Sequence, residues 1–273
     1  MPKIGVAGCG RMGLPKAKAI HDSGFDVQGF DIRSTSEFGN FQNQMTNDIS
    51  DFSKDLQTVF TVVRDQKQTD DLLFDNQNLI GCTKQLEYLV ICSTLSPKYV
   101  HALRDRIPDH IHLIDAPMSG AVIAAQQKKL SFMLGGYADD IAHIQPYLNA
   151  MGHHFHHMGD FGAGMAAKVL NNLLAASSTI ATRLVLDWSD ALGIEEERLL
   201  ALMHTSSGQT WFGSNFDDIE FARDGFDTEN TIGILKKDVE AAVDGAPDNA
   251  DLTLPLTDRK STRLNSSHTS NSY

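Results

Sequence analysis

The polar residues Lys168 and Asn172 stand four apart in the largely apolar opening of a long stretch that runs from Gly162 to Gly193. Apolar residues recur there at spacings of three and four, and no proline lies between Gly164 and Gly193, so the stretch predicts one long helix. Residues four apart share one face of a helix. The helix dipole disfavours a lysine in the first turns, so Lys168 is not there to stabilise the helix. Its amine is a candidate for chemistry, although a lysine on a solvated face fits the same residues.

A glycine-rich segment near the N-terminus is the second feature with chemical meaning. The segment Gly8-Cys9-Gly10-Arg11-Met12-Gly13 follows an apolar run at 4–8, precedes a helical pattern at 14–20, and is followed by a strand pattern at 25–31 that ends in Asp31. This order is the fingerprint of dinucleotide binding, and the alternative is a glycine turn without a ligand. Gly8 permits the tight turn, Gly10 lets the backbone approach a pyrophosphate, and Gly13 lets the helix pack on the strand. The phosphates would lie on free helix N–H groups.

The end of the second strand bears on which dinucleotide is bound. Asp31 can accept hydrogen bonds from both adenosine ribose hydroxyls, and its charge repels a 2′-phosphate. Arg33 could instead pair with a 2′-phosphate. The sequence therefore predicts NAD as the cofactor and leaves NADP open.

Further apolar runs at 56–63, 86–93, 111–115 and 130–134 predict strands of an α/β fold with a Rossmann-type, doubly wound sheet. Ligands of such sheets gather at the carboxyl ends of the strands. Thr94 follows one of these strands and is either a cofactor contact or a helix N-cap. Ser119 and Gly120 follow another, in a segment that we expect to form a tight turn. Their hydroxyl and N–H groups could bind a substrate carboxylate, or the segment is a turn and nothing more.

The composition narrows the classes of protein and of ligand. Of 273 residues, 41% are hydrophobic and 21% are charged, as in a folded globular chain. Because 35 acidic residues face 23 basic ones, the formal charge is −12, which argues against nucleic acid or an anionic membrane as a partner. We see no signal-peptide pattern and no apolar run of membrane-spanning length, so we expect a cytoplasmic protein.

No metal site is predicted from the cysteines and histidines. Cys9, Cys82 and Cys92 stand among apolar neighbours without ligand spacing, which favours free thiols. Four histidines cluster at 153–157, in a strand pattern that would place them on alternate faces. Solvated imidazoles on an edge strand are the preferred interpretation.

Four segments, in this order, resemble the signature motifs of the β-hydroxyacid dehydrogenases: residues 8–15, 115–120, 162–172 and 236–239. Residues 206–211 also resemble a segment of the branch that acts on 3-hydroxyisobutyrate. The match extends from residue 1 to about 257, with Ala121 and Lys128-Lys129 where the family usually has glycine and Gly-Thr. The resemblance implies an NAD(P)-binding N-terminal domain and an all-helical C-terminal domain, joined by the long helix.

The resemblance also implies a role for each site residue. Lys168 would be the catalytic lysine, Ser119 and Gly120 would hold the substrate carboxylate, Asn172 would contact the substrate, and Lys237 would approach the nicotinamide. The cofactor contacts would come from Gly8, Gly10, Arg11, Met12, Gly13, Asp31, Arg33, Thr94 and Lys237. A lysine can act as a base near neutral pH only when its pKa falls from about 10.4 toward about 7–8.

The expected function is hydride transfer between NAD(P) and a small 3-hydroxy acid, with lysine as general acid and base. A reductase of a related semialdehyde, such as tartronate semialdehyde, and a catalytically silent dinucleotide-binding module are the alternatives. A homodimer or homotetramer is expected by the resemblance alone. The expected domains are residues 1–162 for the dinucleotide and 163–258 for a truncated helical substrate and dimerisation domain. Residues 259–273 are polar, serine-rich and aperiodic, which predicts a disordered, non-native tail.

Overall fold

The computed structural model describes residues 3–120, 125–219, 222 and 231–252, with the backbone alone for 231–235. The tail predicted at 259–273 lies outside these residues. The chain divides into two compact units, residues 1–168 and 169–273, and each is described by itself.

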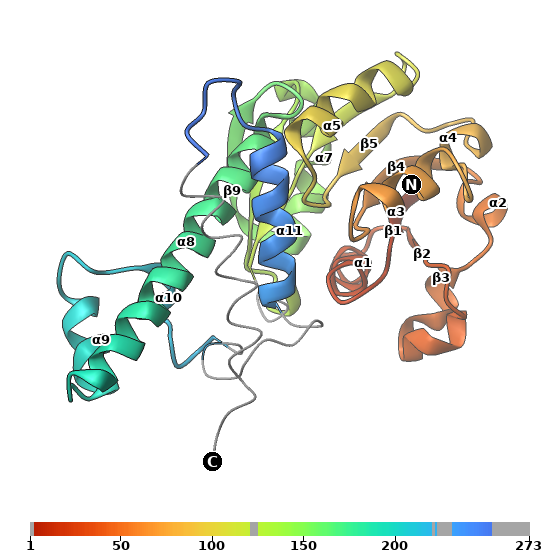
Figure 1. Ribbon diagram of the computed structural model, residues 1–273. Coiled ribbons are helices and arrows are strands. Elements are labelled where there is room, and N and C mark those ends of the chain that lie inside the picture. Colours follow the sequence, from red (N-terminus) through yellow and green to blue (C-terminus); the bar gives the residue numbers. More distant parts are fainter. Residues whose placement is uncertain (1–2, 121–124, 220–221, 223–230, 253–273) are drawn as a thin grey trace. The chain divides into compact units, whose positions relative to one another are not determined.

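The described residues of the first unit form a nine-stranded sheet (Figure 1). Its parallel part runs in the order β3-β2-β1-β4-β5-β6. The bounds of β1 to β6 are Lys3–Ala7, Val27–Phe30, Met45–Thr46, Leu56–Thr61, Tyr88–Ile91 and His112–Asp115. The strand order reverses between β1 and β4, which is the switch point at which open parallel sheets bind ligands. The predicted α/β, Rossmann-type fold is confirmed.

Three more strands extend the sheet beyond β6. Strand β8 (Leu130–Gly135) is antiparallel to β6 and to the short β7 (Met118–Ser119), and β9 (Gly152–Gly159) is parallel to β8. We expected the segment around Ser119 to be a tight turn, and this was wrong. Ser119 pairs with Ser131 in the sheet, and Gly120 follows with a φ of 130°.

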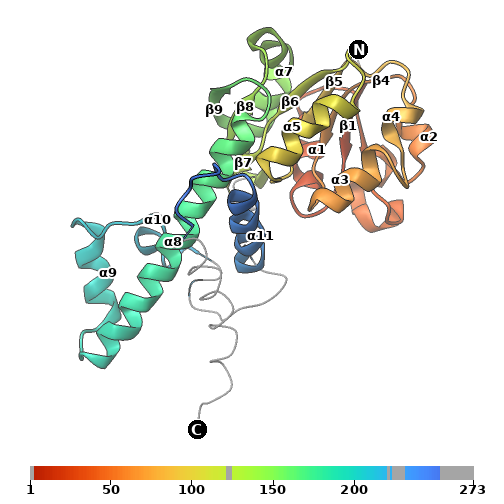
Figure 2. The same cartoon turned by 45° about the horizontal axis from the view of Figure 1, so that its top comes forward.

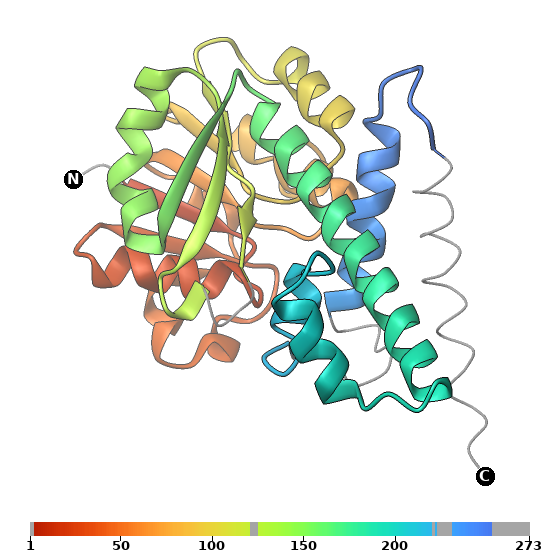
Figure 3. The same ribbon diagram turned by 90° about the vertical axis from the view of Figure 1, so that its left-hand side faces the viewer.

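Helices cover both faces of the sheet because successive strand residues point to opposite sides. Along β5, Val90 belongs to one apolar core, and Leu89 and Ile91 belong to the other. The first core is closed by α1 (Gly13–Asp22) and α7 (Ala138–Met151). The second is closed by α2 (Ile49–Phe52), α3 (Gln66–Leu73), α4 (Leu79–Cys82) and α5 (Pro97–Leu103), of which the last three line one face (Figure 2). Figure 3 shows α7 and α5 on opposite sides of the strands.

The polar stretch after Asp31, which has no clear periodicity, folds into short elements. A 3₁₀ segment, η1 (Thr35–Gln44), leads into β3 and α2. A second 3₁₀ turn, η2 (Arg104–Arg106), follows α5. The 3₁₀ geometry and a two-residue strand leave no periodic signal in the sequence.

Helix α8 (Ala163–Ala191) is the predicted long helix, and it begins in the first unit and continues into the second. Val169 and Ala176 are buried as the pattern predicts, whereas Leu184 and Leu192 are exposed. By length and composition alone α8 could span a membrane, contrary to our expectation, with 33% of its most apolar window buried. Core helices of soluble proteins pass the same test.

The second unit is helical in its described residues. After α8 come α9 (Glu196–His204), α10 (Trp211–Ser214) and α11 (Thr231–Asp244). Among these described residues, Leu186, Phe212, Phe216 and Ala222 form a buried apolar cluster. The predicted all-helical C-terminal part is therefore confirmed for these residues.

Candidate functional site

The glycine turn after β1 has the close contacts that its sequence predicts. Gly8 has a φ of 91°, and a Cβ there would lie 2.8 Å from the carbonyl oxygen of Val62. A Cβ on Gly13 would lie 2.0 Å from the carbonyl oxygen of Gly8, so only glycine lets α1 begin this close to the turn. At Gly10, by contrast, a Cβ would meet no atom within 4 Å. The backbone of Gly10 therefore faces open space, as the approach of a pyrophosphate requires.

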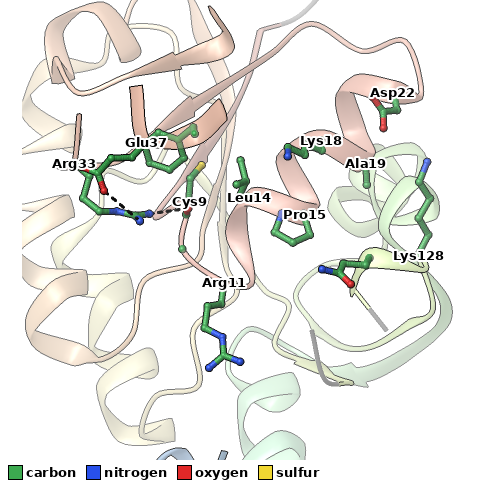
Figure 4. A pocket seen from close by; sticks show the side chains of 13 residues that line it. Cys9, Arg11, Leu14, Pro15, Lys18, Ala19, Asp22, Arg33, Glu37 and Lys128 are labelled. Carbon is green, nitrogen blue, oxygen red and sulfur yellow. Dashed lines mark hydrogen bonds and ion pairs between the residues drawn. The ribbon is translucent and has the colours of Figure 1, made fainter. Parts of the chain in front are cut away.

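The start of α1 is suited to an anion. Met12 is the N-cap and makes no side-chain capping hydrogen bond, and the first turn holds no acidic residue. The N–H of Leu14 already donates to the carbonyl oxygen of Gly10, and Pro15 has no N–H, so phosphate oxygens would be attracted by the N–H groups ahead of Leu14 and by the positive end of the helix dipole. An open pocket of about 520 Å³ extends from Gly10 and Arg11 along α1 to Lys128 (Figure 4). Its volume is within the usual range of cofactor sites. These residues fit a dinucleotide.

Asp31 and Arg33 form an ion pair at the end of β2. The Nε of Arg33 donates to Oδ1 of Asp31 at 3.0 Å, and its Nη2 donates to the carbonyl oxygen of Cys9 at 3.0 Å. The guanidinium also lies 4.8 Å from the ring centre of Phe38. Figure 4 shows Arg33 turned toward Cys9, while Arg11 points away from it. Burial, and then the charge of Asp31, raise the pKa of the Cys9 thiol to about 12, so this thiol is neutral.

Thr94 and Ser119 lie where strands of the first unit end. Thr94 is half-buried, and the N-cap of α5 is Ser96, so the interpretation of Thr94 as that cap is wrong. Ser119 is half-buried in β7, and Gly120 beside it is exposed. Ser119 and Gly120 thus lie beyond the carboxyl end of β6. We expected the substrate carboxylate to bind at this edge of the sheet.

Asp115, at the end of β6, fixes the beginning of α8. Its buried carboxylate accepts hydrogen bonds from the backbone N–H of Gly162 at 2.7 Å and of Met165 at 2.5 Å. Burial raises the pKa of Asp115, and these two hydrogen bonds oppose the rise. A carboxylate at a helix N-terminus satisfies free N–H groups and is favoured by the dipole. Lys168 lies three residues beyond Met165, so this contact sets its place along the helix.

Gly135 and Gly164 make room for the carboxylate of Asp115 because they carry no side chain. A Cβ on Gly135 would lie 2.1 Å from Oδ1 of Asp115, and one on Gly164 would lie 2.9 Å from Oδ2. A Cβ on Gly164 would also lie 2.4 Å from the carbonyl oxygen of Met133 in β8. The first turn of α8 therefore packs directly on the sheet.

Lys168 is buried, with 7% of its surface exposed. The alternative of a lysine on a solvated face is therefore wrong. Asn172, one turn further along α8, is buried as well. A buried amine needs a functional or electrostatic explanation, because moving an ammonium out of water is costly.

In the second unit, Asn172 and Lys237 both contact Asp238. The Nδ2 of Asn172 donates to Oδ2 of Asp238 at 2.5 Å, and the Nζ of Lys237 lies 3.4 Å from Oδ1. Asp238 is buried, so this carboxylate orders both residues that the sequence singled out.

No metal centre is present among the described residues. None of their histidine, cysteine and acidic side chains form a group that could hold an ion. His153, His154, His156 and His157 are all exposed on β9, as predicted for an edge strand. The thiols of Cys9 and Cys92 are buried and free.

Comparisons with known proteins agree with this architecture. Residues 3–159 match the NAD binding domain of 6-phosphogluconate dehydrogenase, and residues 162–271 match the NAD-binding domain of NADP-dependent 3-hydroxyisobutyrate dehydrogenase. The chain is 27% identical to human mitochondrial 3-hydroxyisobutyrate dehydrogenase, over 89% of this chain and 75% of the relative. It is 30% identical to an NAD-dependent L-serine dehydrogenase of Pseudomonas aeruginosa, over 77% of this chain and 72% of that relative. The chain belongs to the β-hydroxyacid dehydrogenase family.

A solved structure of the family has the same fold. A 3-hydroxyisobutyrate dehydrogenase of Mycobacterium tuberculosis with L-serine superposes with a TM-score of 0.85 at 22% identity, covering 98% of this chain and 95% of that one. As a β-hydroxyacid dehydrogenase, this protein is an NAD(P)-dependent enzyme that acts on a hydroxy acid. The second family match extends into residues 259–271, part of the segment that we predict to be a tail.

Sequence reasoning missed two acidic residues of this β-hydroxyacid dehydrogenase. Asp115 and Asp238 each stand inside a recognised motif, but neither was assigned a role. The available signal was their position: Asp115 ends an apolar strand, and Asp238 precedes the apolar Val239 on a helix. An acid at such a position is expected to be buried and hydrogen-bonded.

Proposed function

We propose that this enzyme oxidises a small 3-hydroxy acid, such as 3-hydroxyisobutyrate, with Lys168 as the general base. The observation that carries the proposal is a buried amine on α8, whose start is anchored by Asp115 to the carboxyl edge of the sheet. The glycine turn belongs to the same unit. Relatives named for 3-hydroxyisobutyrate and for L-serine share the 3-hydroxy acid group, which supports this substrate class.

Each candidate residue has a defined task in this reaction. Bound NAD supplies the acceptor for the hydride that leaves the carbinol carbon. Lys168, as the free amine, accepts the proton of the substrate hydroxyl, and in the reverse direction its ammonium donates that proton to the carbonyl oxygen. The Ser119 hydroxyl and the Gly120 N–H hold the carboxylate. Asn172 contacts the substrate, and Lys237 approaches the nicotinamide.

For the cofactor, we propose NAD rather than NADP. The phosphates would lie on the turn of Gly8, Gly10, Arg11, Met12 and Gly13, with Thr94 as a further contact. Asp31 directly follows β2, where the adenosine ribose binds in folds of this type, and the charge of its carboxylate disfavours a 2′-phosphate. Arg33 is paired with that carboxylate and partly neutralises it, so the preference should be moderate.

Further assignments follow the resemblance to the family. We propose a homodimer or homotetramer, a cytoplasmic location, and a dinucleotide domain at 1–162 followed by a substrate and dimerisation domain at 163–258. Size-exclusion chromatography with light scattering tests the oligomeric state. A truncation at Asp258 that leaves the melting temperature unchanged is expected if residues 259–273 are a superfluous tail.

The decisive experiment is a turnover screen with the Lys168→Ala variant as its control. Wild-type protein should reduce NAD with 3-hydroxyisobutyrate, L-serine or 3-hydroxypropionate, or consume NADH with tartronate semialdehyde. Lys168→Ala should lose about 10²–10⁴ in kcat while binding NAD as the wild type does. The control variant Lys67→Ala removes an exposed lysine on α3 and should keep full turnover. NAD binding without turnover on any substrate would support the silent module, and full turnover by Lys168→Ala would refute the role of that residue.

A further inference from the structure

The guanidinium of Arg33, just after β2, is held in place by several contacts at once. Its Nε and Nη2 donate to the two oxygens of Asp31 at 3.0 and 3.2 Å. Nη2 also donates to the carbonyl oxygen of Cys9 in the glycine turn at 3.0 Å. The buried ring of Phe38 lies beneath the guanidinium, with its centre 4.8 Å from the guanidinium carbon. These contacts join the end of β2 to the turn and orient a planar cation between them.

The edge of this guanidinium is largely occupied. A guanidinium has five N–H donors, and the hydrogen bonds to Asp31 and Cys9 use three of them. The other two donors belong to Nη1, and the carboxylate of Glu37 lies 4.0 Å from that atom. A 2′-phosphate at Nη1 would meet the negative charges of Glu37 and Asp31. The edge of Arg33 is therefore poorly suited to a phosphate.

The face of the guanidinium is better placed for a ligand than its edge. The Arg33 side chain is 45% exposed although Phe38 lies beneath it. Arg33 and Phe38 line the same pocket as Gly10 of the glycine turn, and Figure 4 shows Arg33 reaching from the end of β2 to Cys9 at this end of the pocket. A planar guanidinium stacks on aromatic rings, and stacking needs no free N–H donor.

We propose that the open face of Arg33 binds the adenine ring of the cofactor, so that Arg33 recognises the base and not a 2′-phosphate. This inference rests on the proposed binding of NAD at the glycine turn, and it adds a contact for the adenine. Asp31, where the adenosine ribose is expected, is hydrogen-bonded to Arg33, so ribose and base would meet neighbouring side chains. Because NAD and NADP both carry adenine, Arg33 adds affinity for both, and the discrimination between them is left to the charge of Asp31.

The first test measures dissociation constants of Arg33→Lys by isothermal titration calorimetry. Lysine keeps the positive charge but has no planar face. ADP-ribose, NAD and NADP should each bind about tenfold more weakly than to the wild type, as expected for the loss of one stacked base. Arg198→Lys changes an exposed arginine of α9 and should leave all three constants unchanged. Wild-type affinity of Arg33→Lys for ADP-ribose overturns the inference. A loss confined to NADP also overturns it, because Arg33 would then be a phosphate ligand.

The second test observes the contact directly and needs no turnover. In protein with 13C-labelled arginine and bound ADP-ribose, NMR should show nuclear Overhauser effects between the H2 and H8 protons of adenine and the Cδ protons of Arg33. The Arg33 signal is assigned by its loss in Arg33→Lys. Bound ADP-ribose without these effects overturns the inference, even if the enzyme is active. The same effects in a protein that turns over no hydroxy acid support the adenine contact and instead refute the proposed function.

Discussion

Replacing Asp115 by asparagine separates the anchoring of α8 from the chemistry of Lys168. The amide has nearly the shape of the carboxylate but keeps only one acceptor oxygen. Its NH₂ group must face either the N–H of Gly162 or that of Met165, so one hydrogen bond is lost and one buried N–H group stays unsatisfied. Gly135 and Gly164 lie so close to this side chain that it has no room to rotate away.

The expected loss of stability is about 2 kcal/mol. A buried N–H group without a partner costs about 1–3 kcal/mol, and the remaining hydrogen bond is weaker once the acceptor is neutral. Against this, the amide avoids burying a charge, and the raised pKa of Asp115 indicates that this burial is itself unfavourable. Urea unfolding at neutral pH measures the difference. The Asp139→Asn variant, an exposed acid in the first turn of α7, is a matched control and should change by only a few tenths of a kcal/mol.

The same variant should lose kcat, because Lys168 lies one turn from the released N–H groups. A shift of about 1 Å in a catalytic group can cost about 10²-fold in rate. The hydrogen bonds of Asp115 go to the start of α8 rather than to the glycine turn, so NAD affinity should stay at the wild-type value. An Asp115→Asn protein whose stability and kcat both equal those of the wild type would show that this carboxylate does not position α8.

Three further predictions concern other residues of the first unit. The pKa of Lys16 falls from its usual 10.5 to about 8 on folding, so its contribution to stability is complete above about pH 10.5 and is lost as the pH falls through about 8. The free energy of unfolding in urea, taken for the wild type relative to Lys16→Met, should thus rise by about 3 kcal/mol as the pH is raised from about 8 to about 10.5. Lys128 has a φ of 58°, so Lys128→Gly should be more stable by about 0.5–1 kcal/mol in urea, whereas Lys129→Gly should be less stable. Arg33→Ala, which frees the charge of Asp31, should raise the ratio of kcat/KM for NAD over NADP by about tenfold.

Local patterns in the sequence predicted the elements that carry a periodic signal. The order of β1, glycine turn, α1 and β2 was predicted because each part has a local cause: an apolar run, glycines with close contacts, and an amphipathic helix. The segment around Ser119 was mistaken for a turn, because Pro, Ser and Gly favour turns locally while pairing with β8 depends on residues far along the chain. The contacts of Asp115 with Met165 and of Asn172 with Asp238 join residues 50 and 66 positions apart, so no local rule reveals them.

Lys16 shows how a buried charged residue can be overlooked in a helix pattern that was otherwise interpreted correctly. Gly13, Ala17 and Ile20 are buried on α1, and position 16 completes the spacing of three, four and seven that defines the face packed on the sheet. A lysine on this face contradicts the apolar pattern of its own helix. Such a local conflict is expected where function outweighs stability. Lys16 was therefore marked in the sequence by a charged side chain at a core position, and the structure places that side chain in the interior beside Met118.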